Sequence, residues 1–408
     1  MKFLISIICC MLLLNQWLPA ENIHKSYTLN ELIQLAQANN LLLKITNLDK
    51  KIAREEYRDL RALPNPELEY SRGKGEIPGE TFKPSLHSIS LKWSVPNPLY
   101  RHYSLASMKK NVRSAEIEAD MQKREIIKNL KIHYFRLQFY KKVKTFMQEK
   151  LRILEEVNTI TRAKVSIGES KEIDYLRSSV EIQKSKTYLF KVDKTIAYER
   201  TKLNEYLNYN LPADFTITDN FGFTPLPGIE DEISRLIDKS PLISLKSNQV
   251  DREKAHLKAA RLSILESIEV FGEKEKEMEG NIQRIGIGIS IPIFNLKSAH
   301  VRKAKLQKEK AETEFIHTQK HFFADIQQVI SEIRILEKEV ETFKGAILKE
   351  GRENMELSEK LYKAGEVPLM VFLDSQNSFF EVQERFYEAI TEWNILRANL
   401  EVLLGEEL

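Results

Sequence analysis

The chain has 408 residues, 42% of them hydrophobic and 30% charged, a length compatible with two or three domains. Lysine and arginine number 62 against 59 aspartate and glutamate, so the formal net charge is only +3. Both signs are mixed along the chain, without the basic patch that nucleic-acid binding requires. Nucleic acid is therefore not an expected partner.

The first twenty residues differ in character from the rest. Lys2 stands near the start, an apolar run extends to Leu14, and the small residue Ala20 ends the segment. This order predicts a secretory signal peptide over 1–20, because the apolar run is too short for a permanent membrane helix; a retained N-terminal anchor is the alternative. Cleavage would remove Cys9 and Cys10, the only cysteines, so we expect neither a disulfide nor a thiolate ligand.

Residues 21–210 are predicted to form a first structural repeat. Thr28 is expected to cap a short helix to about Asn39, and a second helix follows over about 41–63. A β-hairpin is predicted at 66–96, with a loop rich in glycine and proline between its strands. A long helix over about 99–164, a turn near 168 and a returning helix complete the unit.

Residues 230–408 repeat this order after a linker at 211–229 that is rich in proline, aspartate and glycine. The second unit has a helix over about 241–265, a β-hairpin at 267–292, a long helix over about 296–362 and a turn near 365. Pro292 lies 196 positions after Pro96, and Gly365 lies 197 after Gly168. Because several unlike elements match at one offset, we predict an internal duplication.

The stretch 284–296 joins the two kinds of element. Four isoleucines alternate with polar or small residues, which predicts a strand with one apolar face that Pro292 ends. They are Ile285, Ile287, Ile289 and Ile291. In the helices, apolar residues recur at steps of three and four from Phe322 to Ile347 and from Val382 to Leu403, the a/d repeat of a coiled coil. Each long helix would reach roughly 100 Å, too long for a compact domain.

Four short strands with an apolar face need closure in lipid, and the smallest barrels have about eight strands. Because one chain supplies four, several copies would have to share one barrel. The predicted fold class is mainly α with a small β part. Each chain would contribute four strands to the shared β-barrel, and the long coiled-coil helices would extend from it.

The chain resembles the TolC-like outer-membrane efflux proteins from Tyr27 to Leu404. The resemblance rests on the duplicated order of elements, on S-I-P-I-F-N at 290–295, on Y-K-A-G-E at 362–366 and on F-L-D-S-Q-N at 372–377. It implies a homotrimer with a twelve-stranded barrel in the outer membrane and a twelve-helix tunnel in the periplasm. The 211–229 linker would lie at a belt around the tunnel.

The resemblance also implies a passive exit duct that receives substrate from an inner-membrane pump through a periplasmic adaptor, or membrane fusion, protein. No catalytic motif is present in the sequence, so neither enzymatic activity nor a cofactor is expected. The L-P-N-P-E-L stretch at 63–68 is similar to the heavy-metal efflux branch of the family. The alternative is a soluble periplasmic coiled-coil adaptor or scaffold, which predicts one helical hairpin and no strands facing lipid.

The resemblance places the candidate site residues at the helical tips. Asp374 falls on the family's gate position, and Asp174 lies one repeat earlier and three positions off, on a face close to it, so three copies of each would form acidic rings. The family's second gate carboxylate falls on Val371 in this chain. A simpler interpretation is that both aspartates pair with lysines on the helix surface.

The tip turns are the expected docking points for the adaptor, and Gly168 and Gly365 are also expected to end their helices. The candidate contacts are Ile167, Gly168, Glu169, Ala364, Gly365 and Glu366, while Pro96 and Pro292 mark the junctions between strand and helix. His317 and His321 have the i, i+4 spacing of metal ligands. No third ligand stands in that turn, so a solvated surface is expected and no metal site is predicted.

Overall fold

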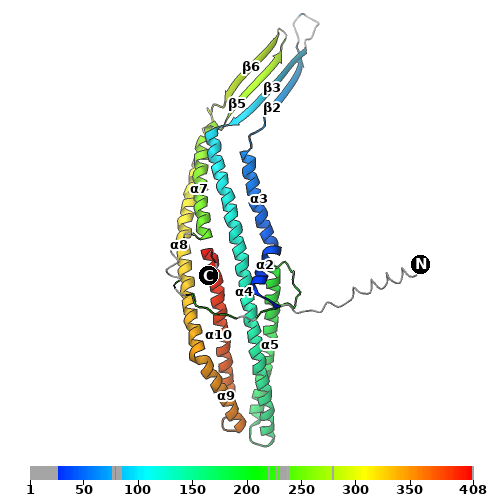
Figure 1. Ribbon diagram of the computed structural model, residues 1–408, viewed down its shortest axis with the longest axis vertical. Helices are drawn as coiled ribbons and strands as arrows, with labels where there is room; N and C mark the ends of the chain where they lie inside the picture. Colours follow the sequence, from blue (N-terminus) through cyan, green and yellow to red (C-terminus); the bar gives the residue numbers. More distant parts are fainter. Residues whose placement is uncertain are drawn as a thin grey trace, which may run out of the picture.

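The computed structural model describes residues 26–75, 79, 85–218, 221–226, 228, 237, 239–277 and 280–406. The predicted signal peptide at 1–20 lies outside the described residues. The molecule is elongated, with a twisted sheet at one end and helices that run lengthwise to turns at the other end (Figure 1). None of the described helices has the length and apolarity needed to cross a membrane.

Helices account for most of the described chain. They are α2 (Leu29–Asn39), α3 (Leu41–Arg61), α4 (Pro98–Ser166), α5 (Glu172–Tyr206), α7 (Pro241–Leu262), α8 (Ser298–Thr342), α9 (Leu348–Ala364) and α10 (Leu369–Leu404). The strands are β1 (Ser26–Tyr27), β2 (Glu67–Lys74), β3 (Ser85–Pro96), β4 (Thr216–Ile217), β5 (Ser267–Lys276) and β6 (Asn281–Ile289). A 3-10 turn at Ser263–Leu265 follows α7, and a π-helical segment at Phe343–Ile347 joins α8 to α9.

Local signals explain where the helices begin. Thr28 accepts a hydrogen bond from the Glu31 N–H and the Glu31 carboxylate accepts one from the Thr28 N–H, a reciprocal capping box at the start of α2. The side chain of Asn97 caps α4, whose first residue is Pro98, a position where the missing N–H has no cost. With 69 residues, α4 extends about 100 Å, which confirms the predicted length.

The helices form two levels (Figure 1). The upper level next to the sheet contains α3, α7 and the first halves of α4 and α8, and the lower level contains α5, α9, α10 and the second halves of α4 and α8. The α8 and α10 repeats meet in one core, which includes Phe322, Ile326, Val340 and Trp393. The predicted coiled-coil positions are therefore confirmed up to Val340. Phe343 and Ile347 fall in the π segment, which holds no buried residue.

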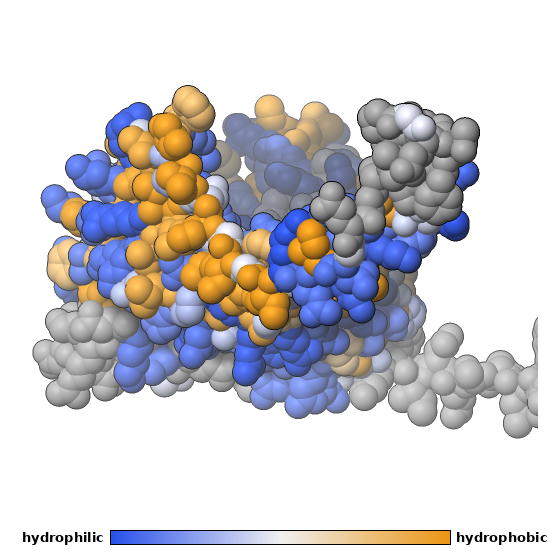
Figure 2. All heavy atoms as spheres, turned by 90° about the horizontal axis from the view of Figure 1, so that it is seen from above, coloured by the Kyte–Doolittle hydropathy of each residue, from blue (hydrophilic) through white to orange (hydrophobic). Residues whose placement is uncertain are grey.

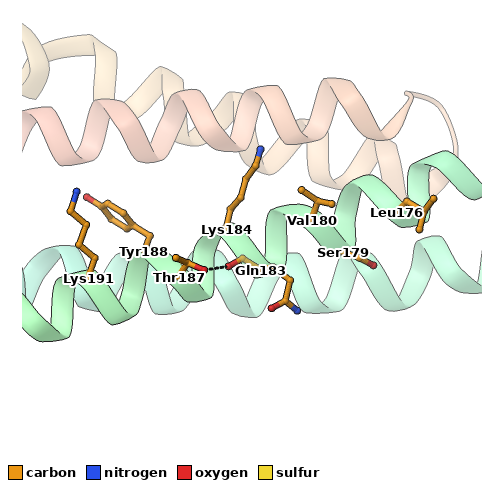
Figure 3. A pocket seen from close by; sticks show the side chains of 8 residues that line it. All are labelled: Leu176, Ser179, Val180, Gln183, Lys184, Thr187, Tyr188 and Lys191. Atoms are coloured by element: carbon orange, nitrogen blue, oxygen red, sulfur yellow. Dashed lines mark hydrogen bonds between the residues drawn. The ribbon is translucent and has the colours of Figure 1, made fainter.

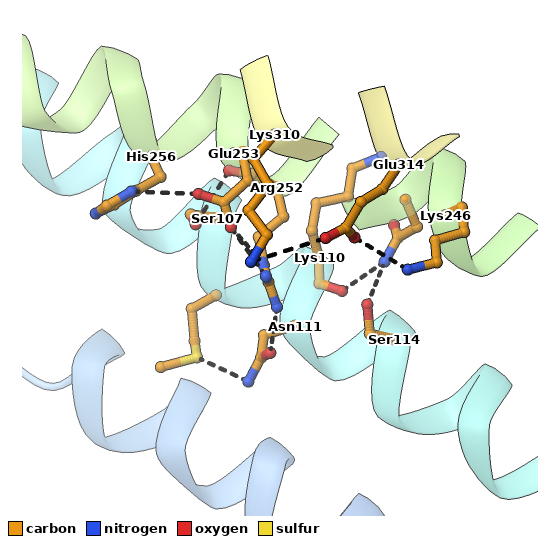
Figure 4. Close-up of polar contacts among 12 residues, drawn as sticks. Ser107, Lys110, Asn111, Ser114, Lys246, Arg252, Glu253, His256, Lys310 and Glu314 are labelled. Atoms are coloured by element: carbon orange, nitrogen blue, oxygen red, sulfur yellow. Dashed lines mark hydrogen bonds and ion pairs between the residues drawn. The ribbon is translucent and has the colours of Figure 1, made fainter. Parts of the chain in front are cut away.

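Polar contacts join α4, α7 and α8 in the upper level (Figure 4). The Asn248 amide donates to the Lys110 carbonyl at 2.7 Å and to the Ser114 hydroxyl at 3.0 Å. Lys246 pairs with Glu314 at 3.1 Å. Because Asn248 is buried, these bonds have geometric requirements that apolar packing lacks, and they favour one register between the helices.

The described part of the predicted linker is attached from two sides. On one side, β1 pairs with β4 in parallel, and Gln138 and Lys141 of α4 donate to the carbonyls of Thr218 and Ile217. On the other side, the segment 221–226 lies on α8 and α10. There the buried Glu337 carboxylate accepts hydrogen bonds from the Leu226 N–H at 2.9 Å and the Trp393 indole at 3.4 Å. Arg334 also bonds Glu337, at 2.8 Å.

Two predicted boundaries are wrong. The second hairpin was expected to end at Pro292, but β6 ends at Ile289, which pairs with Ile268 near the start of β5. Because β5 begins only at Ser267, just after the 3-10 turn Ser263–Leu265, no strand residue lies opposite Ile291 or Pro292. The second long helix was expected to be continuous over 296–362, but it begins at Ser298 and is interrupted at 343–347.

Candidate functional site

The sheet has the order β2-β3-β5-β6 and is antiparallel throughout. The two hairpins, one from each half of the chain, are joined by the long pairing of β3 with β5. Both β2 and β6 are edge strands within the described chain, with one side of each unpaired. Unpaired backbone edges need another strand, water or a cover.

The two faces of the sheet differ in polarity. Ile285, Ile287 and Ile289 lie on one face and are 91%, 71% and 59% exposed. The register places further apolar side chains on that face, namely Leu68, Tyr70, Ile89, Leu91, Trp93, Val95, Ile268 and Val270. Seen from the sheet end, apolar side chains form a continuous band beside hydrophilic ones (Figure 2). So much exposed apolar surface is typical of an interaction face.

The opposite face carries charges. Lys92 pairs with Glu69 at 2.9 Å, and Arg284 lies 3.3 Å from Glu273 and 3.1 Å from Glu275. Gly286 is on this face, and a Cβ atom there would lie 2.5 Å from the Phe271 ring. A side chain at 286 would therefore have to displace the Phe271 ring, which covers that backbone.

The strand-to-helix junctions differ between the two halves. Pro96 is the last residue of β3 and pairs with Ser267, and α4 begins two residues later at Pro98. Pro292 lies outside any strand, in a tight turn in which the Ile293 N–H donates to the Ile291 carbonyl at 2.9 Å. Helix α8 begins only at Ser298, so the second junction is longer.

Both tip turns at the far end are helix terminations with a left-handed glycine. Gly168 has φ of 80° and Gly365 has φ of 82°. The Glu169 N–H donates to the Lys164 carbonyl and the Glu366 N–H donates to that of Leu361, the bond of a Schellman motif. The candidate docking residues Ile167, Gly168, Glu169, Ala364, Gly365 and Glu366 are all exposed in these two turns.

The two turns are connected through residues that the sequence did not single out. The Tyr362 hydroxyl lies 2.6 Å from the Thr161 hydroxyl in a buried contact between α9 and α4. The Thr161 hydroxyl donates its proton to the Val157 carbonyl at 2.8 Å, so the Tyr362 hydroxyl is the donor in its bond with Thr161. Lys164 donates to the Tyr362 carbonyl at 2.8 Å and lies over its ring. Tyr362 is the first residue of the Y-K-A-G-E motif, and that motif is the only feature of the sequence that draws attention to this residue.

An ion pair one turn away connects the same two helices. Lys363 of α9 lies 2.5 Å from Glu156 of α4 and 2.7 Å from Glu359 of its own helix. The hydrogen bond from Lys363 lowers the pKa of the Glu156 carboxyl. Because this pair is exposed, its contribution to stability is small, and the buried hydroxyl pair is the stronger connection.

The two candidate gate aspartates have different surroundings. Asp374 is exposed on α10, beside Met370 and Leu373, in a groove that α5 lines from the other side with Leu176 and Arg177. Among the described residues Asp374 has no ion pair. Asp174 lies in the first turn of α5 and accepts a hydrogen bond from the Ser170 hydroxyl at 3.1 Å. Neither carboxylate pairs with a lysine of the described chain.

Above the aspartates, α5 and α10 approach each other. Val180, Lys184 and Tyr188 point from α5 towards α10 (Figure 3), and the Tyr188 hydroxyl donates to Glu384. Lys150 of α4 donates to the Asn377 side chain at 2.7 Å, and burial lowers the pKa of its ammonium group. The groove beside Asp374 thus lies below a contact that holds α5 and α10 together.

The two histidines of the i, i+4 pair lie side by side on α8. The His317 and His321 rings are 4.3 Å apart between centroids, and both side chains are exposed on α8. Within the described residues, no group of three or more histidine, cysteine, aspartate or glutamate side chains is arranged to hold a metal ion.

Comparison with known proteins supports the sequence resemblance. No family model matches the chain. Nodulation protein T of Rhizobium leguminosarum bv. trifolii is 21% identical over 383 residues, covering 88% of this chain and 81% of that protein. The cobalt-zinc-cadmium resistance protein CzcC of Cupriavidus metallidurans is 18% identical over 244 residues, covering 59% of this chain and 58% of that protein.

Solved structures match over nearly the whole length. The outer-membrane channel OprN superposes with a TM-score of 0.81 at 17% identity, covering 92% of this chain and 89% of that one. CusC, described for its transmembrane channel formation, gives 0.80 at 18% identity, with coverage of 93% and 92%. The chain therefore has the fold of the outer-membrane channels OprN and CusC, which confirms its predicted resemblance to the TolC-like outer-membrane efflux proteins.

Proposed function

We propose that the protein is the outer-membrane exit channel of a tripartite efflux system and conducts substrate passively. Three copies would join their sheets edge to edge into one barrel in the outer membrane, and their helices would form a tunnel in the periplasm. An inner-membrane pump would deliver substrate through a periplasmic adaptor at the helical tips. The fold shared with OprN and CusC supports this proposal.

The observation that carries the proposal is the sheet. It has two unpaired edges, β2 and β6, and an apolar face on which Ile285 is 91% exposed. Joining the edges of neighbouring copies would satisfy the backbone, and lipid would cover the apolar face. A soluble scaffold protein would need neither the unpaired strand edges nor the exposed apolar face.

Cell fractionation tests this proposal. We expect the protein in the outer-membrane fraction as an oligomer that resists SDS at room temperature and dissociates on heating. In a planar bilayer, the purified oligomer should conduct ions. Recovery of a soluble monomer from the periplasm would contradict the channel and favour the scaffold.

We propose that the helical tip is the gate and that opening separates α9 and α10 from α4 and α5. Asp374 would then belong to a ring of three carboxylates that attracts cations. Replacement of Asp374 with alanine is expected to raise the resting conductance and to lower the preference for cations. Asp374→Asn, which keeps the shape, should lower the cation preference with a smaller rise in conductance. Unchanged conductance and selectivity in both variants would remove Asp374 from the gate.

The buried hydroxyl pair gives a second expected result. Thr161→Val leaves the Tyr362 O–H without an acceptor and should shift the tip towards the open state by about 1 to 3 kcal/mol per copy. Tyr362→Phe removes the donor and should cost less, about 1 kcal/mol. Single-channel open probability measures both, and the double variant should resemble Tyr362→Phe. Additive effects of the two substitutions would show that the hydroxyls do not act as a pair.

The exposed tip turns are the proposed docking points for the adaptor. The six residues from Ile167 to Glu169 and from Ala364 to Glu366 lie at the end of the molecule farthest from the sheet (Figure 1).

We propose that the substrates are metal cations, because the chain is similar to CzcC, whose name records cobalt, zinc and cadmium resistance. Loss of the protein should then sensitise cells to these metals, and sensitisation to organic compounds alone would contradict the cargo.

A further inference from the structure

The junction between β6 and α8 is much longer than the corresponding junction between β3 and α4. Eight residues, 290–297, separate β6 from α8, whereas only Asn97 separates β3 from α4. This segment, called the connector below, is strongly apolar: Ile291 is 76% exposed, Ile293 72%, Leu296 62% and Phe294 100%. A fully exposed phenylalanine among exposed aliphatic residues indicates a surface that another phase covers.

The connector is held in place by its own polar groups. The turn at Pro292 is closed by the bond from the Ile293 N–H, and the Asn295 side chain accepts from the Lys297 N–H at 2.9 Å. The Lys297 ammonium pairs with Glu266 at 2.7 Å, which ties the connector to the residue before β5. The apolar side chains are therefore displayed by a fixed backbone.

The connector follows the apolar face of the sheet along the chain. Ile287 and Ile289 of β6 stand on that face, and the connector follows directly from Ile289. The exposed apolar surface thus extends beyond the last paired residue and ends at Leu296, just before α8. Lipid that covers the sheet would have its boundary at this level.

The charges that follow the connector fit a phospholipid surface. From Ile291 to Lys308 the chain has five lysine and arginine residues and no aspartate or glutamate. Arg302 and Lys303 are exposed and make no ion pair with any residue that the structure describes. Apolar side chains followed within two helical turns by free cations match acyl chains followed by phosphate groups.

We propose that the connector is an interfacial anchor that inserts Phe294 into the acyl region of the periplasmic leaflet, while Arg302 and Lys303 contact lipid phosphates. The anchor rests on the proposed outer-membrane function. It fixes how deep the barrel sits in the membrane. It does so at the second junction alone, because the first junction lacks an equivalent of Phe294.

Site-directed spin labelling tests the anchor. Cys9 and Cys10 are the only cysteines, so replacement of both with serine gives a background for single labels in the full chain. Phe294→Cys, Ile287→Cys and Lys303→Cys are labelled separately, and the protein is reconstituted in phosphatidylethanolamine and phosphatidylglycerol vesicles. Collisions with oxygen, which concentrates in lipid, and with a water-soluble nickel chelate are measured for each label. Since Phe294 is fully exposed, Phe294→Cys removes no intramolecular contact.

We expect the ratio of oxygen to nickel accessibility at 294 to exceed that at 303 several-fold and to lie below that at 287. A label at 294 as accessible to nickel as the label at 303 overturns the anchor. Exclusion of both reagents at 294 also overturns it, because a second copy of the chain then covers the connector. The label at 287 separates the two proposals: if it is accessible to nickel, the membrane channel itself is wrong.

Discussion

Ile287→Arg is expected to prevent stable insertion of the protein into the outer membrane. Ile287 is 71% exposed on the apolar face of β6, and its partner across the sheet is Val270. Arginine on the lipid face of a transmembrane barrel costs about 2 to 4 kcal/mol near the bilayer centre. In the proposed trimer the substitution occurs three times. The measurement is the amount of SDS-resistant oligomer in the outer-membrane fraction.

Gly288→Arg is the matched control, since it adds the same side chain at the next residue on the opposite face. A Cβ atom at 288 meets the Glu269 Cβ at 3.5 Å, an ordinary contact, and the added guanidinium can pair with the Glu269 carboxylate. This variant should insert normally. Equal loss of the oligomer in both variants would contradict the proposal that one face of the sheet contacts lipid and the other contacts water.

The second large effect is expected at Glu337, the buried carboxylate that attaches the segment 221–226. Glu337→Ala leaves the Leu226 N–H and the Trp393 indole without their acceptor, at a cost of about 2 to 3 kcal/mol. Since about 1.4 kcal/mol corresponds to tenfold, hydrogen exchange of the Leu226 amide should become up to about 100-fold faster. Mass spectrometry of peptides covering 221–226 gives the rate.

Glu337→Gln is the control because it keeps an acceptor oxygen for Leu226 and loses only the charge that faces Arg334. Its exchange should be less than about tenfold faster than in the unsubstituted protein, in line with the modest net value of one charged hydrogen bond. If Glu337→Ala exchanged no faster than Glu337→Gln, the segment would be held by its aromatic contacts, such as Phe223 on Trp393, and not by the carboxylate.

Much of the fold could be predicted because the signals are local. The box at Thr28, the proline after Asn97, the period-2 isoleucines and the glycines at 168 and 365 each act within about one turn or one strand pair. The boundary at Pro292 was missed because the pairing of β6 stops near the point where β5 begins, and the start of a partner strand is not visible in the residues around Pro292. The break at 343–347 was missed because the heptad pattern continues through it.

The candidate site was predicted only in part. The glycine turns and Asp374 stand in short motifs, so the sequence could place them at the tip. The contact of Tyr362 with Thr161 and the groove between α5 and α10 could not be predicted, because they join residues about 200 positions apart. Asp174, the second candidate gate residue, accepts a hydrogen bond from Ser170 at the start of α5. Such a local bond is common at helix starts and says nothing about a gate.

The amino-acid sequence by itself determined the kinds of element, their order and the polarity of each strand, since these depend on neighbours a few residues apart. Only the tertiary structure decided that β3 and β5 join the two hairpins into one sheet and that Glu337 holds the segment 221–226. It also decided that the side chain of Phe294 in the connector is fully exposed. These features depend on which distant groups satisfy one another's hydrogen bonds, and sequence periodicity carries no information about that choice.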